Sequence, residues 1–406
     1  MGACALYNGT NFALKDVVTV AINYRLGAFG FLAAESMQGN YGFMDQRFAL
    51  QWVNDNIAGF GGNPKDITIG GQSAGGMSVA AHMVAPGSKG LFQKVIQESN
   101  PLGLPVHYRD TATSNANDVF EYMNCAINDV SCAKGKSAEE LLEAQNKAPK
   151  LNLNNLFINF MPWSPMSEEG GEIPEQPLIA LGKGEQASVV PILTGSVKDE
   201  GQLFVWELFT SPISTTAYDA LIKGIFGLKN GKEVLKKYPF ECGGENTTDG
   251  RDALNVLGTD LLFYCPLRNV TRGYQRALGI SAAPTYIYRF HHVISFDCWG
   301  PDYQFCVGWV CHGSELPFVF NVFTDGVSVS YDPTVDEVTL TVDTADAWAN
   351  FITNANPNKG LYVPATFPLY TAASDSFLVI DEPGTHLEDH FRSDFCDMWD
   401  RLGYFY

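Results

Sequence analysis

Basic residues are scarce in this sequence. Lysine and arginine number 26 against 45 aspartates and glutamates, which gives a formal net charge of −19 and a pI near 4.7 over 406 residues. A chain with this balance is repelled by phosphate backbones and by anionic membrane surfaces. We therefore expect no nucleic-acid partner.

Long apolar runs are also missing. None approaches the roughly 20 residues that a membrane helix needs, so we expect no integral membrane span. The first ten residues lack the basic start and apolar core of a signal peptide. The sequence contains no internal repeat, low-complexity tract or linker. With 46% hydrophobic residues it can bury a large core, as one big α/β domain or two smaller ones.

The stretch from Asp66 to Val79 predicts a strand, a sharp turn and a helix. Ile67 and Ile69 alternate with a polar residue as in a short strand, and the glycines that follow allow a tight turn. Residues 71–75 read Gly-x-Ser-x-Gly, the pattern of a nucleophile elbow that lifts the serine hydroxyl clear of a sheet. A serine that caps a helix produces the same pattern, so the motif needs further support.

Apolar runs bordered by turn residues predict the strands. They are residues 17–24, 67–69, 94–97, 189–194, 285–290 and 377–380. Helical spacing of apolar residues, or a capping box at residues 137–140, predicts helices. They are residues 45–57, 78–84, a stretch starting at 137, 343–354 and 388–402. The alternation of strand and helix from residue 17 to residue 84 indicates a parallel, doubly wound α/β sheet.

A nucleophilic serine needs a base, and the base needs an acid partner. His312 lies in a glycine-flanked loop after a predicted strand, whereas His82, His291, His292, His386 and His390 lie on or near predicted helices and strands. The charged loop that follows the predicted strand 189–194 offers Asp199 and Glu200, and the residues alone do not choose between them. The order serine, acid, histidine is that of the α/β-hydrolases.

Ordered landmarks along nearly the whole chain make it resemble the type-B carboxylesterases, which include the cholinesterases. These landmarks are residues 23–31 (NYRLGAFGF), 40–46 (NYGFMDQ), 60–64 (FGGNP), the elbow, 198–201 (KDEG), 311–315 (CHGSE) and 354–358 (NANPN). The resemblance implies an α/β-hydrolase fold, with a mostly parallel, doubly wound sheet and helices on both faces. It also implies Ser73 as nucleophile, His312 as base, Glu200 as acid and the Ala74 N–H as an oxyanion donor.

The resemblance further implies two disulfides among the nine cysteines. Cys125 and Cys132 match a small loop pair, and Cys265 matches the partner of Cys396. Such bonds indicate an oxidising compartment, so we expect a secreted protein or one in the lumen of the secretory or endolysosomal pathway. Buried free thiols in a cytosolic enzyme are the alternative.

The short polar loop between Cys298 and Cys306 suggests a third disulfide there. Three Asn-x-Ser/Thr sequons, at Asn8, Asn246 and Asn269, are candidate glycosylation sites in such a compartment.

The sequence departs from the family pattern at two positions near the site. Gln72 stands where a glutamate commonly precedes the nucleophile, so a carboxylate that would favour cationic substrates is missing. Glu98 stands where the family usually has serine. If it approaches Glu315 behind the histidine, the two carboxyl groups cannot both ionise cheaply and one should have a raised pKa. The alternative is that Glu98 faces solvent or pairs with a cation.

A third departure concerns the start of the chain. In the family, a His-Gly-Gly-Gly-type loop supplies two oxyanion N–H groups and precedes a segment like residues 2–9. We therefore expect a single catalytic domain, residues 1–406, that lacks the N-terminal strands and oxyanion loop. A gap is expected between the strand ending near Tyr24 and the one ending at Gly70, and we expect the chain expressed alone to be poorly soluble or nearly inactive.

The leading functional interpretation is a serine hydrolase that cleaves carboxylic esters through an acyl-enzyme on Ser73. Its substrates would be small-molecule esters, and we expect neither a cofactor nor a metal. A non-catalytic, cholinesterase-like binding or adhesion protein and an inactive, truncated remnant are the alternatives. Family likeness indicates chemistry but not acyl or alcohol specificity.

Overall fold

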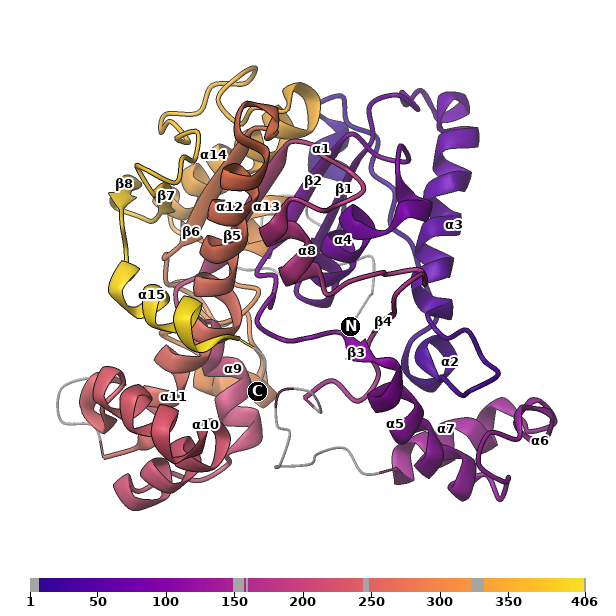
Figure 1. The fold of residues 1–406 in the computed structure, drawn as a ribbon. Coiled ribbons are helices and arrows are strands. Elements are labelled where there is room, and N and C mark those ends of the chain that lie inside the picture. Colours follow the sequence, from indigo (N-terminus) through magenta and orange to yellow (C-terminus); the bar gives the residue numbers. More distant parts are fainter. Residues whose placement is uncertain (1–6, 149–156, 158–159, 244–247, 323–331, 405–406) are drawn as a thin grey trace.

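The protein is described by a computed structural model over residues 7–148, 157, 160–243, 248–322 and 332–404. Its centre is a six-stranded sheet with the order β1-β2-β5-β6-β7-β8 (Figure 1). All neighbours pair in parallel except β7 and β8, which are antiparallel. The strands are β1 Thr68–Gln72, β2 Lys94–Glu98, β5 Ile192–Val197, β6 Thr285–Phe290, β7 Ser376–Ile380 and β8 His386–Asp389, with a separate parallel pair, β3 His107–Tyr108 and β4 Met166–Ser167.

The α-helices are α1 Thr10–Ala13, α2 Gly27–Phe31, α3 Tyr41–Asn56, α4 Ala74–Val84, α5 Arg109–Tyr122, α6 Val130–Lys134, α7 Ala138–Lys147, α8 Pro177–Lys183, α9 Glu200–Leu208, α10 Thr215–Lys237, α11 Gly250–Gly258, α12 Cys265–Leu278, α13 Leu316–Phe320, α14 Val335–Asn354 and α15 Ser393–Leu402. A π-helical turn, Thr259–Tyr264, joins α11 to α12. None of the helices formed by the described residues combines the length and the apolarity needed to cross a bilayer.

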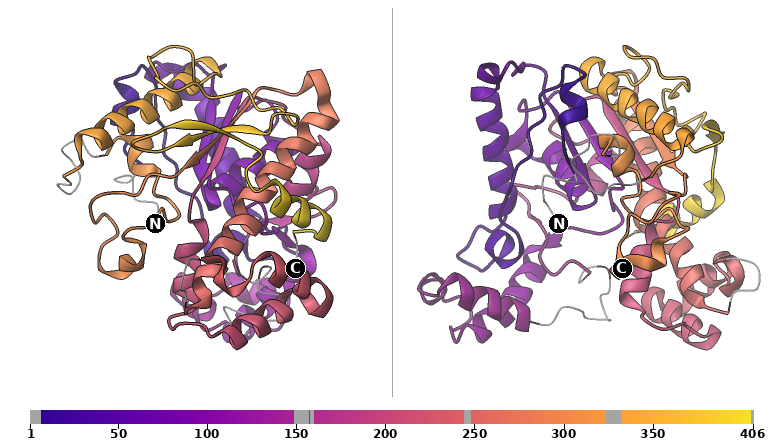
Figure 2. Two further views of the ribbon diagram at one scale, coloured as in Figure 1. Left: turned by 90° about the vertical axis from the view of Figure 1, so that its left-hand side faces the viewer. Right: turned by 180° about the vertical axis from the view of Figure 1, so that it is seen from behind.

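Helices cover both faces of the sheet, and each face carries its own core. Helices α4, α8 and α12 lie in front of the sheet in Figure 1, and α14 covers the opposite face (Figure 2). Successive side chains of a strand point to opposite faces. Val95 of β2 accordingly packs in the core with α4, whereas Ile96 packs in the core with α14. This arrangement confirms the expected α/β-hydrolase fold class.

Five of the six predicted strands are present, and one of them is displaced. The strand predicted at 67–69 forms as β1, Thr68–Gln72. Residues 285–290 are β6 with the predicted bounds, and 94–97 and 377–380 lie within β2 and β7. The strand predicted at 189–194 forms instead at Ile192–Val197. Pro191 has no N–H to donate to a sheet, and the β5 ladder with β6 starts one residue later.

The strand predicted at residues 17–24 is wrong. This segment belongs to no helix or strand, and Val18, Val20 and Ile22 are exposed. Among the described residues, no strand pairs with the outer edge of β1, so no ladder reaches this segment. β-branched composition favours an extended backbone, but a strand forms only where a partner edge lies beside it.

The helix predictions hold except at two places. Residues 388 and 389 belong to β8, which pairs with β7, so the helix predicted from 388 starts only at Ser393. In α3 the apolar residues do not all face the core. Val53 is buried, whereas Phe48 is 74% exposed. The capping box before α7 is formed, with both reciprocal hydrogen bonds between Ser137 and Glu140.

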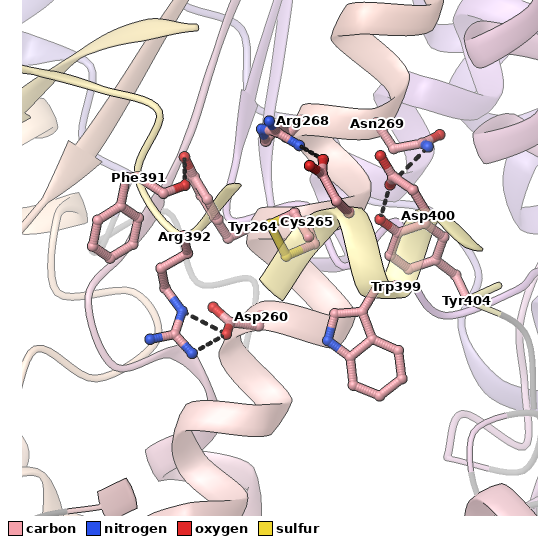
Figure 3. Close-up of a disulfide and its surroundings, with 12 residues drawn as sticks. Asp260, Tyr264, Cys265, Arg268, Asn269, Phe391, Arg392, Trp399, Asp400 and Tyr404 are labelled. Atoms are coloured by element: carbon pink, nitrogen blue, oxygen red, sulfur yellow. Dashed lines mark hydrogen bonds and ion pairs between the residues drawn. A yellow bond between two sulfur atoms is a disulfide. The ribbon is translucent and has the colours of Figure 1, made fainter. Parts of the chain in front are cut away.

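Two of the three disulfides in the described residues are the pairs named from the family resemblance. Cys125 bonds to Cys132, and Cys265 bonds to Cys396 where α12 meets α15 (Figure 3). In this contact Arg268 of α12 binds Asp397 of α15 as well as the buried Asp375. The disulfide and the ion pairs together fix the C-terminal helix to the sheet.

The expected Cys298–Cys306 disulfide is wrong. Cys306 bonds instead to Cys311, five residues later, with a Cα–Cα distance of 5.7 Å. This distance lies within the range that a disulfide can bridge. Cys298 remains a thiol, and burial raises the pKa of this thiol to about 11. Cys4 lies outside the described residues.

Candidate active site

Ser73 occupies the turn between β1 and α4. Its backbone has φ 58° and ψ −120°, a conformation that costs a non-glycine residue about 1 to 3 kcal/mol. Two contacts hold it there: the Ser73 N–H donates to the Glu98 carbonyl at 2.9 Å, and the Ser73 carbonyl accepts from Met77. The turn is tight enough that a Cβ on Gly71 would lie 2.4 Å from the backbone of Gly75. The first motif glycine, Gly71, is therefore explained by close backbone approach.

His312 is joined to Glu200 by a short hydrogen bond. The Nδ1 of His312 lies 2.5 Å from Oε2 of Glu200, and Glu200 is fully buried. The other carboxylate oxygen of Glu200 accepts from the Val197 N–H at 2.9 Å. Glu200 is the first residue of α9, directly after the loop that ends β5, so its carboxylate also lies at the positive end of a helix.

Asp199, the other acid that the sequence offers, does not reach His312. Its carboxylate accepts from the Val310 N–H at 3.1 Å, and its backbone forms a parallel bridge with Cys311. Burial raises the pKa of Asp199, and the hydrogen bond from Val310 opposes that rise. Asp199 therefore ties the acid loop to the histidine loop, while Glu200 contacts the imidazole.

The second ring nitrogen of His312 lies near the side chain of Gln72, a contact that no sequence pattern predicts. The Nε2 of His312 is 3.1 Å from Nε2 of Gln72, the residue before Ser73. Because Nδ1 faces a carboxylate and carries the proton, Nε2 accepts, and the Gln72 amide donates to it. No hydrogen bond joins the Ser73 hydroxyl to His312 in the part of the chain that the structure describes. In unliganded sites such bonds are often long and tighten only with substrate.

Apolar rings surround the imidazole on its remaining sides. The rings of Phe204 and Phe263 lie 4.9 and 5.2 Å from that of His312, centroid to centroid. They keep water from the Glu200–His312 pair, which strengthens its electrostatic interaction.

Ala74 follows Ser73 as the first residue of α4. The first N–H groups of a helix have no acceptor within the helix and point along its positive end. The Ala74 N–H therefore lies where an oxyanion formed on a substrate bound to Ser73 could accept from it.

The other histidines lie elsewhere. His82 is buried between Gln46 and Ser88, and burial lowers its pKa to about 3. Burial and the nearby charge of Arg289 likewise lower the pKa of His291 to about 3. His292 lies within hydrogen-bond distance of the buried Glu337 of α14. His386 and His390 are exposed. Among the described residues, no group of three or more His, Cys, Asp or Glu side chains is arranged to hold a metal ion.

Glu98 and Glu315 lie behind the site as a buried pair. Both are within the core, and the charge of Glu98 is one of the causes that raise the pKa of Glu315. Of the two arrangements that the sequence leaves open, the structure has the one in which Glu98 lies near Glu315. The alternative, a Glu98 that faces solvent or pairs with a cation, is wrong because its carboxylate accepts from the Trp348 indole at 2.6 Å.

The sequons lie in different settings. Asn8 precedes α1, where its side-chain oxygen accepts from Thr10. Asn269 lies on α12, and its amide donates to Asp400 of α15 at 2.9 Å (Figure 3). Asn246 lies outside the described residues.

The disulfide between Cys306 and Cys311 ends one residue before His312, and both cysteines are buried. The sequence holds a signal for this contact, namely two cysteines five residues apart directly before the histidine. The contact between Gln72 and His312 has no comparable signal in the sequence.

The chain resembles known proteins both in sequence and in fold. The profile of the "Carboxylesterase family" matches residues 1–399. The cAMP-regulated D2 protein of Dictyostelium discoideum is 38% identical over 393 residues, which cover 97% of this chain and 70% of that protein. The Crystal protein of the same organism is 34% identical over 99% of this chain and 71% of its own length. The solved structure of a PNB esterase superposes with a TM-score of 0.77 at 30% identity and covers 98% of this chain and 78% of that one.

Proposed function

Because the chain belongs to the carboxylesterase family and is a carboxylic ester hydrolase of the α/β-hydrolase fold, we propose that it works through an acyl-enzyme formed on Ser73. The observation that carries this proposal is the buried hydrogen bond between His312 and Glu200, on loops next to the turn of Ser73. A histidine held by a buried carboxylate keeps its proton on Nδ1 and is ready to accept another on Nε2.

Ser73, His312, Glu200 and the Ala74 N–H have distinct roles in this mechanism. Nε2 of His312 takes the proton of the Ser73 hydroxyl while the oxygen attacks the acyl carbon, and the Glu200 carboxylate stabilises the imidazolium that forms. His312 then gives the proton to the departing alcohol. Water attacks the acyl group on Ser73, again with His312 as base, and the carboxylic acid leaves. The Ala74 N–H donates to the oxyanion in both steps.

Substrate must first free the base. Since the Gln72 amide occupies Nε2 of His312, it has to turn away before the Ser73 hydroxyl can bond there. We propose that the alcohol side of the substrate pocket is uncharged next to the nucleophile, because Gln72 is neutral. Small, neutral carboxylic esters are the substrates that this site suits best.

The disulfides fit a secreted or lumenal protein, and three pairs are present in the described residues. We propose that the protein works in such a compartment and that residues 1–406 form one catalytic domain. The side chains of Asn8, Asn246 and Asn269 remain candidate glycosylation sites there.

A fluorophosphonate probe tests the proposed mechanism. It should add one phosphonyl group to the protein, and peptide mass spectrometry should find it on Ser73. Ser73→Ala and His312→Ala should both lose the label, whereas His386→Ala, an exposed histidine, should keep it. Equal labelling of the wild type and Ser73→Ala would refute the mechanism and would favour a binding protein that only resembles the esterases.

A further inference from the structure

Three glutamates meet behind the imidazole of His312, although only one of them takes part in the mechanism above. Glu200 begins α9, Glu98 ends β2 and Glu315 precedes α13, three residues after His312. Each of the three is at most 4% exposed. The charges of Glu98 and Glu200 both act on Glu315, so the carboxyl groups form one buried cluster.

The direction of β2 explains how Glu98 reaches this place. Gln97 points to the face covered by α4, where its amide contacts the sulfur of Met83, so the next residue points to the face covered by α14. There the Trp348 indole of α14 donates to Glu98 Oε1 at 2.6 Å. The carbonyl of Glu98 accepts from the Ser73 N–H, so this residue also supports the nucleophile through its backbone.

Glu315 has fewer partners than an ionised carboxylate needs. Its Oε1 accepts from the Ser99 hydroxyl at 3.3 Å, and its Oε2 is buried with no hydrogen-bond partner in the structure. A buried charge without hydrogen bonds to both oxygens costs several kcal/mol, and such a group takes up a proton instead.

Neutral or acidic groups face the pair from the other elements packed against it. Tyr7 before α1 and Tyr288 of β6 lie close enough for Glu98 and Glu315 to raise the pKa of both phenols, after burial itself. The Tyr288 hydroxyl is buried and has no hydrogen-bond partner among the described residues, and the Tyr288 ring packs against Trp348 at 4.9 Å, centroid to centroid. No lysine or arginine of the described residues contributes to the electrostatics of either glutamate.

We propose that Glu98 and Glu315 hold at least one proton between them at neutral pH, and that Glu98 is a positioning residue which keeps Glu315 uncharged behind His312. Two carboxyl groups in one buried, cation-free site cannot both be ionised. Burial raises the pKa of Glu98 to about 7, opposed by the Trp348 bond, and burial with the charges of Glu98 and Glu200 raises that of Glu315 further.

The consequence concerns the charge beside the base. While the proton stays on Glu315, that carboxyl group adds no charge next to His312, and Glu200 is the carboxylate that contacts the imidazole. Without Glu98, Glu315 would ionise at lower pH and add a second negative charge behind the imidazole, which favours its protonated and inactive form. Glu98→Ser would remove the carboxyl group that keeps Glu315 protonated.

Infrared spectroscopy of the full chain tests the shared proton without any enzymatic assay. The carbonyl stretch of a protonated carboxyl group should be present at pH 7, where exposed carboxylates are ionised, and should disappear as pH rises. Glu98→Gln and Glu315→Gln should each move the midpoint of this loss down by about one pH unit or more, because the partner's repulsion is gone. Glu388→Gln, the same change on β8, should leave it unmoved. A wild-type spectrum without this band at pH 7, or a midpoint that neither variant moves, would overturn the proposal.

The positioning role rests on the proposed function and has its own test, the pH profile of kcat/KM for an aryl ester. In Glu98→Gln and Glu98→Ser the acid limb should move to higher pH, whereas in Glu315→Gln it should not. An unmoved acid limb in both Glu98 variants would overturn the positioning role. If the proposed function itself fails, the fluorophosphonate does not label Ser73 and no profile exists, but the infrared result still decides whether the pair holds a proton.

Discussion

The side-chain amide of Gln72 lies 3.1 Å from Nε2 of His312, the atom that accepts the proton of the Ser73 hydroxyl in the proposed mechanism. The neighbour of the nucleophile therefore occupies the base in the unliganded structure. Gln72 is neutral, whereas related esterases commonly carry a carboxylate at this position. The residue type at position 72 should therefore affect both the preference for charged substrates and the hydrogen bonding of His312.

Gln72→Glu should create a preference for cationic substrates. A carboxylate about 4 Å from a quaternary ammonium group gains about 4 kcal/mol at an effective dielectric of 20, before desolvation is counted. We expect the ratio of kcat/KM for a choline ester over its uncharged isostere to be near one in the wild type and to rise tenfold or more in the variant. Gln51→Glu, the same change on the exposed face of α3, is the control. A wild type that already prefers the choline ester strongly would contradict this view of the site.

Variants of the triad should not be additive. Ser73→Ala, His312→Ala and the double variant should each lower kcat by on the order of 10⁴-fold or more, since the residues act as one unit. Single-turnover measurements with an activated ester compare them, with the exposed His386→Ala as control. A double variant whose loss is the product of the two single losses would mean that Ser73 and His312 act independently.

The Cys306–Cys311 disulfide should matter for catalysis more than for stability. It closes only a short loop, but that loop ends directly before His312, and a displacement of the base by about 1 Å can cost about 100-fold. Replacing both cysteines by serine should lower kcat by about 10- to 100-fold with a small change in Tm.

The Cys265–Cys396 disulfide provides the matched contrast. It joins α12 to α15 and closes a loop of 131 residues, so the chain-entropy model assigns it about 4 to 5 kcal/mol of the free energy of unfolding. Its removal should lower stability in urea and leave the kcat of the folded protein nearly unchanged. If both double variants showed the same pattern, the short disulfide would have no special role at the site.

Glu337 should make stability depend on acidic pH. Burial alone would raise its pKa, but hydrogen bonds from Ser295, His292 and the N-cap of α14 outweigh burial and lower the pKa to about 2. A folded-state pKa below the unfolded value of about 4.5 stabilises the protein above that pH, and this contribution is lost as pH falls toward 2.

Urea unfolding of Glu337→Gln at two pH values measures this contribution. We expect a clear loss of stability at pH 5.5 and a much smaller one near pH 3. The exposed capping box of α7 supplies the control, since Glu140→Gln removes the same type of cap from a solvated helix end. Equal losses at both pH values would show that Glu337 acts by packing and not by charge.

Much of the fold follows from local sequence. Residues 285–290 form a strand with the predicted bounds because β-branched and aromatic residues predominate in this segment and suit a strand that is buried on both faces. The elbow is equally local, since the close approach at Gly71 and the strained backbone of Ser73 lie within three residues. The sequence also determines the order in which Ser73, the acid and the histidine follow one another along the chain.

Partner-dependent features are not local, and the tertiary structure decided them. Residues 17–24 have the composition of a strand but meet no partner edge among the described residues, and residues 388–389 became a strand because β7 lies beside them. The choice of acid is the clearest case. Asp199 and Glu200 are adjacent, and only the turn from β5 into α9 directs the second toward His312 and the first toward Val310. The direction of a side chain at such a turn depends on packing between segments more than 100 residues apart. A sequence pattern within one segment therefore cannot predict that direction.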